Sequence, residues 1–207
     1  MAIEIAPFRH RFGEKEVIKA AEWTIRIRDV FNLAYLYLMV HDWLVEEGWA
    51  PRDDNFFPET FYVQRDNPTM GKEIWVRWRL TKTPEGAGPA APRLFSYVMD
   101  LNWKVIGMKE VEMAWKGQKV KADRGELEIE CFCKLIIDEE KQWQSWPFKQ
   151  IKGLYTKRII RQKVLVHRKS IYVDAYRLRD LIMNYLKLET FMPVKEAGEF
   201  WLKRSLE

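Results

Sequence analysis

Two cysteines, Cys131 and Cys133, stand one residue apart and are the first candidates for metal or redox chemistry. On a strand, alternate residues share a face with their Cα atoms about 6.6 Å apart, which is close to the outer limit for a disulfide. A structural zinc site needs four ligands, and the sequence offers no second cysteine pair and only His10, His41 and His167. Both cysteines occupy apolar positions of an alternating run, so the sequence favours core cysteines over a metal or redox site.

A row of glutamates is the second candidate. Its members occupy polar positions of two alternating runs: Glu110, Glu112, Glu126, Glu128 and Glu130. Paired carboxylates could hydrolyse a glycosidic bond. The row is too long to define one pair, however, and lysines alternate near it. We therefore interpret it as the solvated, salt-bridged face of a sheet.

The sequence carries no familiar nucleophile or cofactor motif. None of its serines lies in a Gly-x-Ser-x-Gly context, and no Gly-rich phosphate loop is present. His41 stands beside Asp42 in an apolar run, which is typical of a hydrogen-bonded core or boundary histidine. The sequence therefore predicts no cofactor and favours a non-enzymatic protein over an enzyme.

Residues 141–173 contain no Asp or Glu, although the formal net charge of the whole chain is only +5. The segment holds nine cations: Lys141, Lys149, Lys152, Lys157, Arg158, Arg161, Lys163, Arg168 and Lys169. Such an uneven distribution can mark an anionic partner.

Aromatic residues alternate with these cations, as in grooves that bind single-stranded nucleic acid through phosphates and bases. The predicted contact residues are Lys157, Arg158, Arg161, Lys163, Trp143 and Trp146. The alternative is a helix whose aromatic residues face the core and whose cations face water. An anionic membrane surface is a weaker third choice, because the amphipathic pattern is not sustained.

The elements that must position these residues begin with two long alternating runs, residues 95–115 and 127–137. Strict alternation predicts antiparallel strands with one buried face. Gly107 interrupts the first run and predicts a bulge or a bend. Lys116-Gly117 and Asp123-Arg124-Gly125 are turn signals. Residues 60–65 and 73–82 predict a further hairpin, residues 23–28 end another strand, and residues 83–92 form a flexible loop.

Residues 30–47 predict a helix with Asp29 as its N-cap and Gly48 at its C-terminal end. The helix is apolar nearly all round, so both its sides must be covered, by its own fold or by another chain. We predict a homo-oligomer that uses the side carrying Leu36, Met39 and Trp43.

The C-terminal part predicts helices at about 147–166, from 171 onward and at 194–205, with a strand as the alternative near Val164–Val166. The fold class is α+β: a curved antiparallel β-sheet packed against an apolar helix of the N-terminal half and against C-terminal helices. We expect one domain, 1–207. The order of elements is similar to a helix-grip plan, in which a curved sheet wraps a C-terminal helix around an apolar cavity.

Three classes of function follow. The first is a non-enzymatic interaction or self-assembling structural protein, and the second is a nucleic-acid-binding protein that uses residues 141–173. The third is a helix-grip-like carrier of an apolar small molecule. The N-terminus shows no secretory signal, and the apolar run 30–45 is too short and too polar to span a membrane. We expect a cytoplasmic protein, since two cysteines make no disulfide framework.

Overall fold

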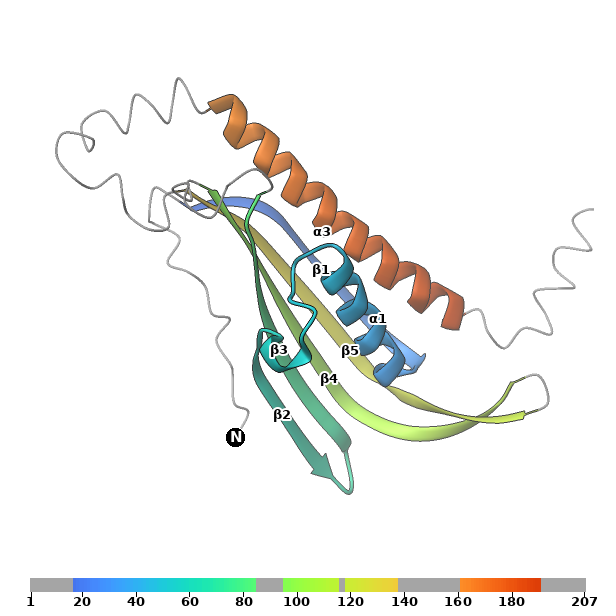
Figure 1. Cartoon of the computed structure of the whole chain (residues 1–207). Coiled ribbons are helices and arrows are strands. Elements are labelled where there is room, and N and C mark those ends of the chain that lie inside the picture. Colours follow the sequence, from blue (N-terminus) through green and yellow to red (C-terminus); the bar gives the residue numbers. More distant parts are fainter. Residues whose placement is uncertain (1–16, 85–94, 116–117, 138–160, 191–207) are drawn as a thin grey trace, which may run out of the picture.

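Five antiparallel strands form one open sheet in the order β1-β5-β4-β3-β2. The computed structural model describes residues 17–84, 95–115, 118–137 and 161–190. The strands are β1 (Val17–Phe31), β2 (Glu59–Asn67), β3 (Gly71–Lys82), β4 (Phe95–Trp115) and β5 (Gln118–Ile137). The helices are α1 (Leu33–Glu46), the short η1 (Asp54–Phe56) and α3 (Arg161–Thr190). Helices α1 and α3 lie on the same face of the sheet (Figure 1). This arrangement confirms the α+β class with an antiparallel sheet.

The core lies between the sheet and the two helices. Alternate residues of β4 and β5 pair across the strands and are buried there: Met99 with Cys133, Leu101 with Cys131, Trp103 with Ile129, and Val105 with Leu127. Neighbouring strands add Trp23, Ile25, Val76, Trp78 and Leu80 to the same layer. Cys131 and Cys133 are free thiols with no exposed surface, so the prediction of core cysteines is confirmed.

Gly107 forms the expected irregularity in β4. The pairing of β4 with β5 shifts between Ile106 and Lys109, and Gly107 has a φ of 63°. Gly71 approaches this bulge from the start of β3, with a φ of 94°. A Cβ atom there would lie 2.7 Å from the carbonyl oxygen of Met108, so only glycine fits.

The structure corrects two local predictions at the end of β1. Asp29 is not the N-cap of α1, because β1 continues to Phe31 and pairs there with Asp123. The predicted turn at Asp123–Gly125 is therefore part of strand β5. Asn32 is the N-cap instead, since its side chain accepts a 3.0 Å hydrogen bond from the backbone N–H of Tyr35. Gly48 ends the helix as predicted, with a φ of 72°.

α3 is one continuous helix, so the strand alternative near Val164–Val166 is wrong and no break precedes Ile171. Its buried residues recur at helical spacing: Ile171, Ala175, Leu178, Ile182, Tyr185 and Leu186. They face β1 and β5. The Trp23 indole N–H donates a 2.9 Å hydrogen bond to the carbonyl of Ala175, which fixes the helix on β1. The predicted helix over 147–160, the helix at 194–205 and most of the loop 83–92 lie outside the described residues.

Candidate functional site

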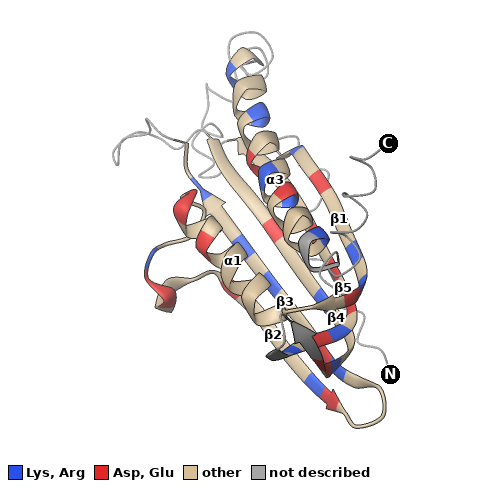
Figure 2. Cartoon of the chain, turned by 90° about the vertical axis from the view of Figure 1, so that its right-hand side faces the viewer, with Lys and Arg blue, Asp and Glu red and all other residues tan. Residues whose placement is uncertain are grey.

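One side of α3, next to its buried stripe, carries exposed or partly exposed aromatic, apolar and cationic residues. We call this surface the outer face of α3 and define it by six residues that share one side of the helix: Leu165, Arg168, Lys169, Tyr172, Tyr176 and Arg179. Tyr176 and Arg179 are partly exposed, and Tyr176 also packs against the core. Leu165 is 53% exposed and Tyr172 is 47% exposed. Figure 2 shows Lys and Arg in blue in the upper part of this helix, with acidic positions further along it.

Three of these side chains are in contact with one another. The ring centroids of Tyr172 and Tyr176 lie 4.3 Å apart, with 33° between the ring planes. The guanidinium carbon of Arg179 lies 5.7 Å from the centroid of the Tyr176 ring, within the range of a cation–π contact. A hydrogen bond with Tyr172 raises the pKa of Tyr176, so its phenol keeps its proton at neutral pH. The rings are therefore held together on the helix surface.

Cations are the only charged residues of α3 before Asp174, whereas both cations and acids follow it. Lys163, Arg168 and Lys169 are exposed, and among the described residues no carboxylate lies within ion-pair distance of them. Asp174 is the first acid of the helix, and it is buried 3.5 Å from the ammonium of Lys82. Asp180 is exposed one turn beyond Tyr176, so the excess of cations over acids is larger in the first half of the helix.

The structure places only part of the predicted anionic-partner site. Arg161 and Lys163 lie in the first turn of α3. Lys157, Arg158, Trp143 and Trp146 lie outside the described residues, so their contribution stays a prediction. Sequence reasoning missed Tyr172, Tyr176 and Arg179 as members of this surface. Their spacing of four and three residues places them on one side of a helix, and this is the signal that could have found them.

The predicted oligomer surface on α1 is largely covered by the chain itself. Leu36 has no exposed surface, and Met39 and Trp43 are partly buried against the core. The description of α1 as apolar all round therefore needs correction, because Asp42 and Glu46 lie on its exposed side. Two apolar side chains share that side: Tyr35 is 58% exposed and Leu38 is 57% exposed. The homo-oligomer stays a prediction.

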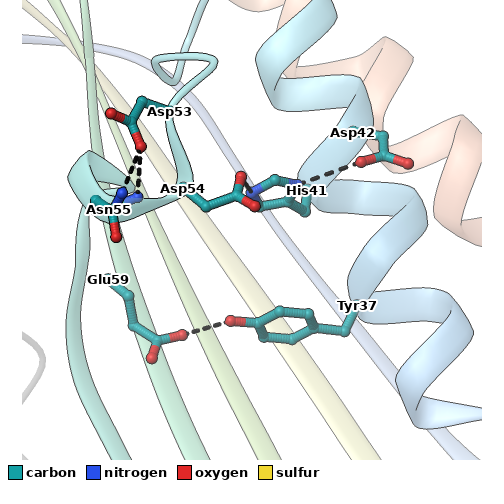
Figure 3. A network of polar contacts seen from close by, with 7 residues as sticks. All are labelled: Tyr37, His41, Asp42, Asp53, Asp54, Asn55 and Glu59. Carbon is teal, nitrogen blue, oxygen red and sulfur yellow. Dashed lines mark hydrogen bonds and ion pairs between the residues drawn. The ribbon is translucent and has the colours of Figure 1, made fainter.

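His41 lies between two carboxylates in the network drawn in Figure 3. Its Nδ1 is 3.3 Å from Asp42 Oδ1, and its Nε2 is 3.6 Å from Asp54 Oδ1. Its ring packs on Phe57 at a centroid distance of 4.4 Å. Both ring nitrogens thus face acids of α1 and η1, an arrangement that ties the loop before β2 to the helix. This agrees with the interpretation of His41 as a hydrogen-bonded boundary histidine.

Tyr37 makes the second link between α1 and β2 in Figure 3. Its hydroxyl donates a 2.6 Å hydrogen bond to Glu59, which also accepts a 2.9 Å bond from the Trp78 indole N–H. Burial, together with Glu59, raises the pKa of Tyr37, so the phenol is no base at neutral pH. Among the described residues no set of three or more His, Cys, Asp or Glu side chains could hold a metal ion.

A tyrosine–histidine pair joins β4 to α3. The hydroxyl of Tyr97 lies 2.6 Å from His167 Nδ1, and the Phe95 ring packs on the imidazole at a centroid distance of 4.4 Å. Burial lowers the pKa of His167, and the charge of Lys163 lowers it further. The imidazole is therefore neutral near pH 7, which suits a hydrogen-bonded link better than a charged one.

Several other polar groups of the sheet are paired with neighbours. On the face opposite the helices, Lys134 donates a 2.8 Å bond to Asp100, and both are buried. Three members of the glutamate row form ion pairs: Glu110 with Lys72, and Glu126 and Glu128 with Arg26.

Two indoles in the core differ from these groups. The N–H groups of Trp49 and Trp103 are buried and have no hydrogen-bond partner among the described residues. A bound ligand with an acceptor oxygen would satisfy such donors. The carrier hypothesis stays a prediction.

Comparison with known proteins adds no functional assignment. No protein-family model matches the chain, and no curated protein matches it. Neither α1 nor α3 combines the length and the apolar character that crossing a bilayer requires.

Proposed function

We propose that this chain is a non-enzymatic protein that binds an extended polyanion along the first half of α3. The observation that carries the proposal is the exposed set Lys163, Arg168 and Lys169, which has no carboxylate nearby among the described residues. Solvated cations on a rigid helix can exchange their counterions for phosphate or sulfate groups, and the released counterions favour binding.

The non-enzymatic part of the proposal rests on what the polar clusters do. The His41 and Tyr37 contacts tie α1 to η1 and β2, and the Tyr97–His167 pair ties β4 to α3. Each cluster has a positional role in the fold. A cytoplasmic location fits the proposal, because the free thiols of Cys131 and Cys133 suit a reducing compartment.

The test measures binding to a labelled deoxythymidine oligomer and to labelled heparin by fluorescence anisotropy, at several salt concentrations. We expect binding that weakens steeply with salt, with each phosphate contact adding about 0.7 to the log–log slope. Replacing Lys163, Arg168 and Lys169 by Gln together should lower that slope by about 2 for the oligomer.

A matched control changes the same number of charges elsewhere. Lys104, Lys109 and Lys121 are exposed on β4 and β5, and their joint replacement by Gln alters the net charge equally. The control should keep the salt slope of the unaltered protein. The proposal fails if neither polyanion binds at low salt, or if the control variant loses as much affinity as the α3 variant.

Self-assembly is the second candidate function. Its support is the pair Tyr35 and Leu38, which are both more than half exposed on the outward side of α1. Light scattering coupled to size-exclusion chromatography should then report a mass above the 24.9 kDa of the chain, and Leu38→Glu should shift it towards the monomer. A single 24.9 kDa species at high micromolar concentration would contradict this candidate.

A further inference from the structure

The aromatic part of the outer face of α3 has no role in a purely electrostatic site. The ring of Tyr176 contacts both the ring of Tyr172 and the guanidinium group of Arg179. The Tyr172 ring is 47% exposed and stands one turn from the exposed Arg168 and Lys169. A planar ring beside two cations matches the repeating unit of a nucleotide chain, in which each base lies next to a phosphate.

We infer that the polyanion is single-stranded nucleic acid, and that Tyr172 and Tyr176 form a platform on which a base stacks while Arg168 and Lys169 contact the adjoining phosphates. The inference rests on the proposed function and deepens it. Stacking on aromatic side chains tolerates any base, because every base has a π-face. The site would therefore bind with little sequence preference.

The stacking surface favours an unpaired strand over a duplex. In a duplex the base faces are stacked on one another, so an exposed tyrosine ring on a helix surface has no base face to contact. Phosphates are available in both forms, so the cations alone would not distinguish them. Base-dependent affinity for single strands is the property that the tyrosines add.

Charge argues against a second copy of the chain as the occupant of this surface. A symmetric pairing of two α3 helices would bring Arg168, Lys169 and Arg179 of both copies together, and like charges at close range repel. An anionic bilayer also fits less well. At 100° per residue Lys169 lies between the apolar pair Leu165 and Tyr172 and the apolar pair Val166 and Val173, so it interrupts the apolar area.

The decisive comparison uses a deoxythymidine oligomer and an abasic oligomer of equal length, which carries the same phosphates without bases. We expect the unaltered protein to bind the deoxythymidine oligomer about tenfold more tightly or better. Tyr172→Leu should remove most of that difference while leaving abasic binding unchanged, and Tyr172→Phe should preserve it. Tyr62→Leu is the matched control, because Tyr62 is 52% exposed on β2.

The outcomes separate this inference from the proposed function. Equal affinity for the two oligomers, or a Tyr172→Leu variant that keeps the base preference, would overturn the inference and leave polyanion binding intact. Tighter binding to duplex than to single strand, or to anionic phosphatidylserine vesicles than to either, would also overturn it. If neither oligomer nor heparin binds at low salt, the proposed function fails, and the inference fails with it.

Discussion

α3 has two parts with different surroundings. From Ile171 onward its inward residues pack on β1 and β5, and hydrogen bonds from Trp23 and Tyr185 connect it to the rest of the chain. Over residues 162–170, by contrast, Val164 and His167 are the partly buried positions and all the others are exposed. The first part carries cations without acids, whereas the second carries the buried apolar stripe.

One helix can thus contribute to stability through one part and to binding through the other. Packing on the sheet fixes the direction of the helix through its second part, so the exposed side chains of the first part are held on a regular frame. A binding surface on a rigid helix has fewer arrangements to lose on binding than one on a loop. Tyr172 stands at the boundary between the two parts, just after the buried Ile171.

The largest expected difference in the free energy of unfolding comes from placing one negative charge in each part of α3. Leu178→Asp would bury an unpaired carboxylate at a position with no exposed surface, which costs several kcal/mol and should unfold the domain. Leu165→Asp, at a position 53% exposed, should change the free energy of unfolding by no more than about 0.5 kcal/mol. Urea unfolding followed by tryptophan fluorescence measures both. Similar stabilities for the two variants would remove the distinction between the parts.

A smaller effect is expected from the hydrogen bond that fixes the second part. Trp23→Phe removes the indole N–H that donates to the carbonyl of Ala175, and it should lower the free energy of unfolding by about 1–2 kcal/mol. Tyr172→Phe, which removes a hydroxyl at an exposed position, should leave the free energy of unfolding nearly unchanged. The same urea titrations apply, and an unchanged free energy of unfolding for Trp23→Phe would show that this hydrogen bond does not stabilise the packing of α3 on β1.

The smallest effect on stability concerns pH, at the position where the first part of α3 contacts Tyr97 of the sheet. Burial and Lys163 lower the pKa of His167 below the value near 6.5 of the unfolded chain. As pH falls through 6.5, the unfolded state takes up a proton before the folded state does. The stability that the neutral imidazole contributes is therefore present above pH 6.5 and is lost below it, as the pH falls through the folded-state pKa.

The measurement is thermal unfolding between pH 7.5 and pH 5, for the unaltered chain and for His167→Gln. The groups that face the imidazole are the hydroxyl of Tyr97, the ring of Phe95 and the ammonium of Lys163. The variant should show a shallower loss of melting temperature on acidification. Parallel pH profiles for the two proteins would contradict the assignment.

Periodicity predicted most of the sheet but misplaced its local boundaries. The alternation of β4 and β5 reflects which side chains are buried, and the break at Gly107 reflects a backbone conformation that favours glycine. Both signals are local in the sequence. Asp29 and Asp123 were misread for a different reason. An aspartate is typical of a helix cap or a turn. Here, however, Asp29 of β1 pairs with Gly125 of β5, and Asp123 of β5 pairs with Phe31 of β1. Pairing between distant segments overrode the local preference.

The surface of α3 was harder to predict than the core. The acid-free segment predicted Arg161 and Lys163 as contacts for an anionic partner. A count of charges does not tell, however, which side of a helix faces the sheet. Once Ile171 and Leu178 define the buried side, the exposed position of Tyr172 follows from the helical period. The burial of Leu36 within the chain was equally hidden from the sequence, because a helical pattern does not tell which apolar side the fold itself covers.

The strand order has a consequence for how the chain folds as it is synthesised. β1 is made first, but its neighbour in the sheet is β5, which is made after every other strand. The hairpins β2–β3 and β4–β5 can close between adjacent segments, whereas β1 and the helix that follows it must wait for most of the chain to leave the ribosome. During that interval the apolar side of β1, with Trp23 and Ile25, has no strand to pair with. Early protection of this segment would therefore matter more for the yield of folded protein than the final stability of β1 suggests.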